Sequence, residues 1–219
     1  MVQLSILIVT IGRDTLSRTF ESIVEQLDEC DFLYIAIDGP AFYEKAKLQI
    51  DAYRNSFKCK IIVFEHPVNV GFWGNELRTF YQTKLEGDYI MYSDDDDVYT
   101  RNALSHIRNA IGNKRGKLFV FKMCLCYDNH RLVPQGNSME KVFRFTNIGA
   151  PCGVVANEPS KLGVWPPTGG GDCEFWTQTA QKFSQENIEY SECVTYCALE
   201  RSCDKSAQDL QEIHENIKR

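Results

Sequence analysis

The sequence predicts an α/β fold in which a largely parallel sheet is covered by helices on both faces. Short continuous apolar runs, typical of strands buried on both faces, recur through the first half of the chain. Longer segments with apolar residues at helical spacing separate these runs. Polar or acidic residues follow the ends of several runs. This alternation is typical of strand–helix–strand units that wind into one sheet.

The elements of the first half are expected in regular order. Residues 4–10 form the first strand, and a helix follows in which Leu16, Phe20, Ile23 and Leu27 make one apolar stripe. The further expected strands are 32–37, 61–64, 89–92 and 118–126, and the further expected helices are 41–57, 76–85 and 101–111.

The second half is less regular. We expect a short antiparallel strand at 142–146, loops at 147–153 and 166–171, a helix at 172–182 and a polar terminal helix at 206–217. The 219 residues suit one domain, 1–219, whose halves 1–100 and 101–219 meet at a soft boundary near residue 100.

Composition excludes several classes of protein. The net charge of −6 and the lack of a long basic cluster argue against nucleic-acid binding. No apolar run reaches the roughly 20 residues that span a bilayer. The apolar N-terminus lacks the features of a signal peptide, so the nine cysteines are expected to be reduced and the protein cytoplasmic.

Four consecutive carboxylates, Asp94–Asp97, directly follow the apolar run 89–93. Adjacent carboxylates repel one another, so the run needs a cation or must turn partly to water. Hard divalent ions such as Mn²⁺ or Mg²⁺ take oxygen ligands and bridge carboxylates to diphosphates. A metal–diphosphate site and a solvated acidic turn are the two interpretations of this segment alone.

The positions of three polar residues favour a site here. Thr10, Asp38 and Asp94 each stand at the carboxyl end of an expected strand. Ligands of open α/β sheets bind at that edge.

Five segments in this order resemble the GT-A glycosyltransferases, above all the large inverting family 2. They are 5–13, Asp38, 69–75, 87–97 and 170–176, and together the resemblance spans residues 3 to 182. The Ser-Asp-Asp-Asp-Asp form and the brevity of the chain also resemble small glycosyltransferases of large algal viruses, which would act in the cytoplasm of the host cell.

The resemblance implies a nucleotide-sugar donor, with UDP as the expected nucleotide, and a carbohydrate acceptor. Half 1–100 would bind the donor and half 101–219 the acceptor. Asp96 and Asp94 would hold Mn²⁺ or Mg²⁺, while Asp97 would be solvated. The residues expected to contact the donor are Thr10, Gly12, Arg13, Asp38, Gly71, Phe72, Asn75, Asp94 and Asp95.

Inverting transfer also needs a base that accepts the proton of the acceptor hydroxyl. The resemblance leaves Asp172 or Glu174 for this role, because Gly171 stands where the family usually has Glu. Asp172 is preferred to Glu174, although an Asp at a helix start is also a common N-cap. Arg78 is one register step from the family's phosphate-contacting Arg, so its role is in doubt.

Other aromatic and sulfur groups have weaker interpretations. Phe72, Trp73, Trp165 and Trp176 would either stack on sugars or lie in the core. Cysteines 173, 193, 197 and 203 fit no common zinc spacing and are expected to be ordinary thiols.

Three other functions compete with sugar transfer. A haloacid-dehalogenase-type phosphatase would use Asp94 as a nucleophile but carries its motif on the first strand. A nucleotidyltransferase would need a better phosphate loop than 11–14. A non-catalytic carbohydrate-binding module would not need Asp172.

Overall fold

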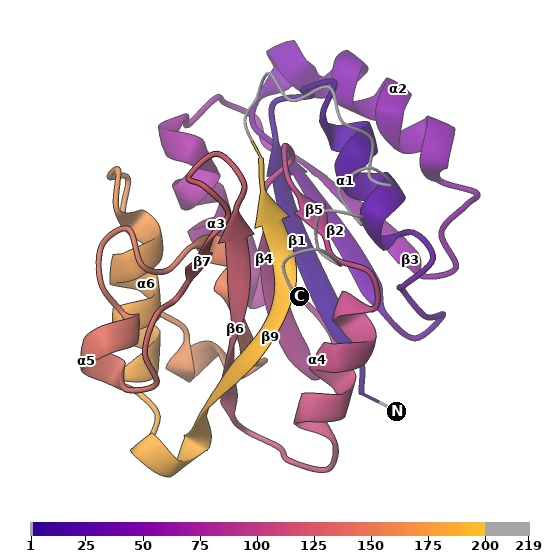
Figure 1. The fold of residues 1–219 in the computed structure, drawn as a ribbon. Helices are drawn as coiled ribbons and strands as arrows, with labels where there is room; N and C mark the ends of the chain where they lie inside the picture. Colours follow the sequence, from indigo (N-terminus) through magenta and orange to yellow (C-terminus); the bar gives the residue numbers. More distant parts are fainter. Residues whose placement is uncertain (1, 200–219) are drawn as a thin grey trace.

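The computed structural model describes residues 2–199, in which one mixed sheet forms the centre of the molecule (Figure 1). Its first part is parallel and consists of β1 (Leu4–Thr10), β2 (Phe32–Ile37), β3 (Lys60–Glu65) and β4 (Tyr89–Ser93), in the order β3-β2-β1-β4. Every residue of β1 is buried, as its continuous apolar sequence predicts.

The second part of the sheet is mixed. It contains β8 (Gly153–Ala156), antiparallel to both β4 and β6 (Leu118–Leu125), and β9 (Ile188–Ala198), parallel to β6. Two short strands complete it: β5 (Val98–Tyr99) pairs with β9, and β7 (Arg131–Val133) pairs with β6. The sheet thus joins strands from both expected halves of the chain.

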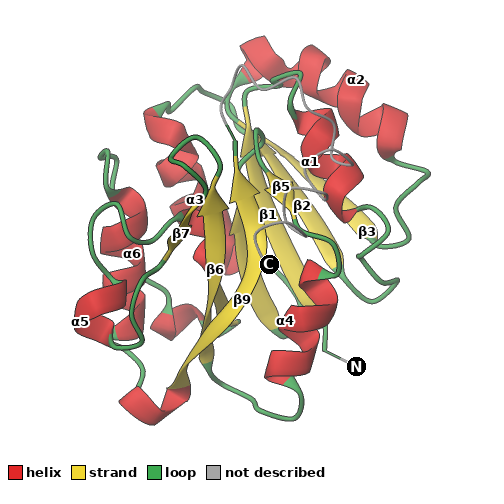
Figure 2. Cartoon of the chain, in the orientation of Figure 1, coloured by secondary structure: helices red, strands yellow, loops and turns green. Residues whose placement is uncertain are grey.

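Helices flank this sheet on both sides (Figure 2). They are α1 (Leu16–Ile23), α2 (Tyr43–Tyr53), α3 (Asn75–Tyr81), α4 (Ala103–Ile111), α5 (Met139–Val142) and α6 (Gly171–Ala180). In α1 the predicted stripe faces inward, because Leu16, Phe20 and Ile23 are fully buried. The mixed α/β fold predicted from the sequence is confirmed, and its helices are shorter than expected at several ends.

The prediction of a strand at 142–146 is wrong. Val142 ends helix α5 instead, and the residues that follow it make no ladder hydrogen bonds with a neighbouring strand. The expected loop 147–153 overlaps the start of β8 at Gly153. The expected terminal helix at 206–217 lies outside the described residues.

A cluster of large aromatic rings fills the space between α6 and the sheet. The rings of Trp165 and Phe175 stack with centroids 4.0 Å apart, and Tyr92 and Trp176 pack edge-on against Phe175. Trp165 and Trp176 are fully buried. The alternative in which Trp165 and Trp176 stack on sugars is therefore wrong, because both side chains are buried in the core.

Across residues 2–199, no helix has the length and apolar character required to cross a bilayer.

Candidate active site

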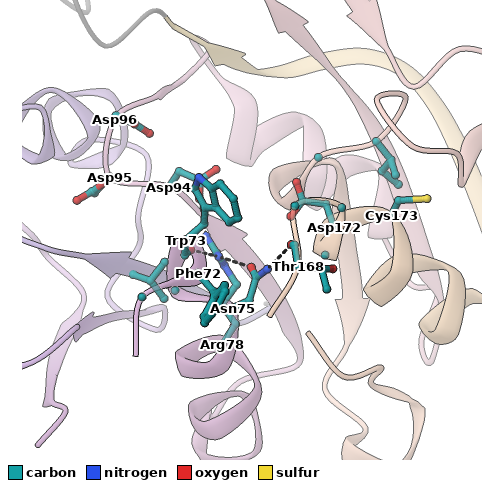
Figure 3. Close-up of a pocket in the computed structure, with 18 of the residues that line it drawn as sticks. Phe72, Trp73, Asn75, Arg78, Asp94, Asp95, Asp96, Thr168, Asp172 and Cys173 are labelled. Atoms are coloured by element: carbon teal, nitrogen blue, oxygen red, sulfur yellow. Dashed lines mark hydrogen bonds and ion pairs between the residues drawn. The ribbon is translucent and has the colours of Figure 1, made fainter. Parts of the chain in front are cut away.

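A cavity of about 880 Å³ opens at the carboxyl ends of β1, β2 and β4. The acidic run borders it on one side, and Asp172 lies on the opposite side (Figure 3). The predicted site residues that line it are Thr10, Arg13, Asp38, Gly71, Phe72, Asn75, Asp94, Asp95, Asp96 and Asp172. Gly12 and Glu174 do not line it.

Asp95 is held by two residues of the first loop. Thr10 donates a hydrogen bond of 2.6 Å from its hydroxyl to Asp95 Oδ2, and the Arg13 guanidinium pairs with Asp95 Oδ1. Gly12 supports this arrangement from behind, since its N–H donates to Thr10 Oγ1 at 2.8 Å. These contacts connect the loop after β1 to the loop after β4, and the two loops together form one wall of the cavity.

Asp38 uses both carboxylate oxygens to shape a loop. The N–H groups of Val70 and Gly71 donate to its Oδ1 and Oδ2 at 2.7 and 3.0 Å, and Asn69 Nδ2 donates to its backbone carbonyl at 2.9 Å. Asp38 also lines the cavity. It therefore joins the end of β2 to residues 71–74, the glycine loop, at the cavity wall.

The glycine loop places two aromatic side chains at the cavity. Phe72 and Trp73 have φ of 46° and 55°, in the left-handed region that residues with a Cβ adopt rarely. Their side chains are 55% and 63% exposed, although both line the cavity. Large apolar rings held in a strained conformation and open to water point to a ligand that would cover them.

Arg78 is a buried cation at the cavity wall. Its guanidinium pairs with the Asp94 carboxylate and donates to the carbonyl of Trp73 at 2.8 Å. It is 1% exposed and lies against the ring of Trp165 at 5.1 Å. The sequence left the role of Arg78 in doubt, because Arg78 is one position away from the Arg that is usual in the family. In the structure Arg78 lies at the site, because α3 begins directly after the glycine loop.

The last two carboxylates of the run point to different environments. Asp96 lines the cavity, and its backbone carbonyl accepts a hydrogen bond of 2.6 Å from Arg18. Asp97 accepts a hydrogen bond of 2.8 Å from the N–H of Leu199 and is buried. Burial, reinforced by the charges of Asp94 and Asp96, raises the pKa of Asp97. The expectation that Asp97 is solvated is therefore wrong.

The donor set fits a hard divalent cation. Asp94 and Asp96 bring carboxylate oxygens to the same cavity, and their side chains are 38% and 15% exposed. Asp95 is engaged by Thr10 and Arg13, and Asp97 is buried and accepts the N–H of Leu199. Two carboxylates with room for further oxygen ligands suit Mn²⁺ or Mg²⁺ bound together with phosphates.

Asp172 lies in the first turn of helix α6 and is partly buried, and burial raises its pKa to about 6. The Asp94 charge acts in the same direction, while Arg78 opposes it. Glu174 is exposed and accepts a 3.4 Å hydrogen bond from Gln178, one turn further along the helix. Of the two candidate bases, only Asp172 faces the cavity.

Part of the wall comes from residues that sequence reasoning did not select. Leu125 of β6, Tyr127 of the β6–β7 turn and Arg131 of β7 line the cavity, as does Phe145. Phe145 is 67% exposed. No local signal marks these residues, because they reach the site only through the antiparallel part of the sheet.

The amino-acid sequence matches a known family. The sequence model of glycosyl transferase family 2 matches residues 5–158, which is most of the chain. The chain belongs to glycosyl transferase family 2. This membership favours sugar transfer over the phosphatase, nucleotidyltransferase and binding-module interpretations. No curated protein is significantly similar in sequence.

Solved structures support the same fold. The S. aureus TarS 1–349 structure superposes with a TM-score of 0.71 at 15% identity, over 90% of this chain and 60% of TarS 1–349. The complex of TarS 1–349 with UDP-GlcNAc gives 0.70 at 15% identity, over 99% and 65%. The mannosyltransferase PcManGT from Pyrobaculum calidifontis, in complex with GDP-Man and Mn²⁺, gives 0.62 at 12% identity, over 99% and 64%. This chain therefore spans less than two thirds of each of these structures.

Proposed function

We propose that this protein transfers a sugar from a UDP-sugar to a hydroxyl group of a carbohydrate acceptor, with inversion at the anomeric carbon. The observation that carries the proposal is the cavity that sets Asp94 and Asp96 opposite Asp172. A carboxylate pair for a metal–diphosphate and a separate partly buried carboxylate are the two groups that such a transfer needs.

The donor would lie along the ends of β1, β2 and β4. Thr10, Arg13 and Asp38 would contact the nucleoside, and Asp94 and Asp95 would lie near the ribose. The glycine loop, with Gly71, Phe72 and Asn75, would approach the diphosphate and sugar. Support for a uridine nucleotide comes from TarS, whose structures contain UDP and UDP-GlcNAc, whereas PcManGT contains GDP-Man.

Asp94 and Asp96 would hold Mn²⁺ or Mg²⁺. Such an ion stabilises the negative charge of a leaving diphosphate without a proton donor. Arg78 is the protein's own cation at this position, and its ion pair with Asp94 orients that carboxylate toward the cavity.

The acceptor would enter beside the exposed rings of Phe72, Trp73 and Phe145, whose apolar faces suit the C–H faces of a sugar. Asp172 would accept the proton of the attacking hydroxyl as the bond to the anomeric carbon forms. Its raised pKa favours this role, because a stronger base at neutral pH takes a proton more readily. Attack on the face opposite the leaving diphosphate would invert the anomeric centre.

The Ser-Asp-Asp-Asp-Asp form supports, as a further proposal, an origin among the small glycosyltransferases of large algal viruses, with action in the cytoplasm of the host cell.

A pair of variants tests the assignment of the base. UDP release from UDP-GlcNAc and GDP release from GDP-mannose would be measured with Mn²⁺, with water as acceptor. Asp172→Asn should lower turnover on the order of 10²-fold or more, since a general base contributes roughly 10²–10⁴-fold. Glu174→Gln, the matched change two residues away on the exposed face, should leave turnover unchanged. Equal turnover in wild type and Asp172→Asn would refute the assignment.

A further inference from the structure

A second group of polar side chains lies behind the wall of the cavity. Cys124 and Cys126 alternate along β6 with Met123, Leu125 and Tyr127, which line the cavity. Successive side chains of a strand point to opposite faces, so the two thiols lie together on the side away from the cavity. Cys126 continues the ladder beyond β6, because its N–H donates to the carbonyl of Ala198 at 2.9 Å.

His130 joins these two thiols from the β6–β7 turn. Its Nδ1 lies 3.8 Å from Cys124 Sγ, and Cys126 Sγ lies 3.9 Å from Cys124 Sγ. The three ligand atoms all lie within 4.8 Å of one another, and among residues 2–199 theirs is the one such group of three metal-ligand side chains. The residues Asn129 and His130 have φ of 48° and 56°, so the turn brings the imidazole back toward the strand in an uncommon backbone conformation.

The spacing of these atoms matches a tetrahedral zinc site. Zn–S bonds of about 2.3 Å and Zn–N bonds of about 2.0–2.1 Å at tetrahedral angles separate two sulfur ligands by about 3.8 Å. The same geometry separates a sulfur from a nitrogen ligand by about 3.6 Å. The observed separations of 3.9 and 3.8 Å are close to these edges.

Cys197 offers a fourth ligand from the neighbouring strand. It is the register partner of Cys124 across the β6–β9 ladder, and it is buried. It packs with Cys124 in one small buried cluster that Cys126 borders, outside the group of three atoms that lie within 4.8 Å of one another. Three thiols and an imidazole are one of the usual ligand sets of structural zinc.

We propose that Cys124, Cys126, His130 and Cys197 bind one zinc ion that joins β6, the β6–β7 turn and β9. Soft thiolate ligands favour zinc over the hard Mn²⁺ or Mg²⁺ proposed for the cavity. The ligand set differs from the cysteines 173, 193, 197 and 203 weighed from the sequence, because strand pairing brings Cys197 to a Cys-x-Cys segment about 70 residues earlier.

The zinc ion would stiffen the wall that carries part of the site. Leu199, two residues after Cys197, donates its N–H to Asp97 of the acidic run at 2.8 Å. Tyr127 and Arg131, on either side of the turn that carries His130, line the cavity. The ion would hold these segments in register without touching the donor.

The test is elemental analysis of protein purified under reducing conditions from zinc-containing medium. Wild type should carry about one zinc ion per chain. His130→Gln changes an exposed side chain and should fold normally, whereas Cys126→Ser removes a thiolate. After dialysis against a weak chelator, the zinc content of both variants should be at least about 10-fold lower than that of wild type. Cys59→Ser, a buried free thiol beside β3, and Asp96→Ala should both retain it.

A second measurement keeps the proposal open to refutation if Cys126→Ser misfolds. Co²⁺ added to metal-free wild type should produce the intense sulfur-to-metal absorption of a thiolate site, and the band should weaken in His130→Gln. Absence of zinc, equal zinc in His130→Gln, loss of zinc in Asp96→Ala, or a disulfide among these cysteines by mass spectrometry would each overturn it. None of these readouts depends on transferase activity.

Discussion

At the scale of single residues, Asp172 is the carboxylate whose environment says most about the reaction. Burial and the Asp94 charge raise its pKa, and Arg78 lowers it, with a net value of about 6. A base must be ionised to accept a proton. The proposed transfer should therefore be fully active above this value and lose activity as the pH falls through it.

The pH profile of kcat/KM checks this expectation. We expect an acid limb with an apparent pKa near 6, since kcat/KM reports the groups of the free enzyme. The same shift has a consequence for stability. Because the pKa of Asp172 in the folded state lies above its ordinary 3.8, the neutral form stabilises the fold below about pH 4, and this contribution is lost as the pH rises through about 6.

Asp172→Asn should accordingly raise the free energy of unfolding by on the order of 2 kcal/mol at pH 8 and by little at pH 4, as measured by urea unfolding. Equal destabilisation of Asp172→Asn at both pH values, together with a kcat/KM profile that shows no acid limb, would contradict the interpretation of Asp172 as an ionised, partly buried carboxylate.

Sequence reasoning found the acidic residues of the site but not all of their partners. Asp94–Asp96 and Asp172 stand directly after a strand or at a helix start, where the pattern of the chain is informative. The side chains of Tyr127 and Arg131 carry no such mark. The burial of Asp97 was missed because its partner, Leu199, is 102 residues away.

At the scale of elements, the glycine loop 71–74 lies between β3 and α3 in the chain. All four residues have positive φ, from 46° to 74°. Gly74 also lies against β1, where an added Cβ would come within 2.6 Å of Val9 Cγ2. At Gly71 an added Cβ would meet nothing within 4 Å. The two glycines differ in conformation as well as in surroundings: Gly74 is left-handed, with ψ 14°, whereas Gly71 has ψ −142°, close to a region that is essentially restricted to glycine.

Gly71→Ala and Gly74→Ala should therefore destabilise the loop for different reasons. Gly71→Ala should cost about 1–3 kcal/mol, because only glycine adopts this backbone conformation readily. Gly74→Ala should cost about 1 kcal/mol for a left-handed residue with a Cβ, and roughly a further 1–3 kcal/mol because it overpacks the core against Val9. Chemical denaturation measures both, and a Gly74→Ala variant as stable as wild type would show that the loop moves freely to accept the Cβ.

The elements of the first half were predictable because each buried parallel strand is a continuous apolar run. β9 was missed because its first half is only partly buried and carries Glu and Ser among its apolar residues. The Cys-Val-Thr-Tyr-Cys segment 193–197 within it contains β-branched and aromatic residues, which are enriched in strands, and is the signal that could have identified β9. β5 and β7 are too short to leave a periodic pattern.

At the scale of the whole molecule, the sheet combines two kinds of wall. Parallel strands present their carboxyl ends to the donor side, and the mixed part formed by β8, β6, β9 and β5 carries residues of the opposite side. The acidic run lies where the two parts meet, directly after β4. This position explains why one cavity receives both a proposed metal–diphosphate site and a separate base.

Calorimetric titration tests most directly whether the acidic run binds a nucleotide-sugar through a divalent metal, as we propose. UDP-, GDP- and TDP-sugars would be titrated into wild type with and without Mn²⁺, and into two variants. Asp96→Ala should weaken Mn²⁺-dependent binding by at least about 10-fold. Asp14→Ala, whose carboxylate is 90% exposed and pairs with Lys45 outside the cavity, should bind as wild type does.

We expect one UDP-sugar to bind wild type and Asp14→Ala only when Mn²⁺ is present. Binding that is equally tight without Mn²⁺ and in Asp96→Ala, or no binding of any nucleotide-sugar with Mn²⁺ present, would contradict it.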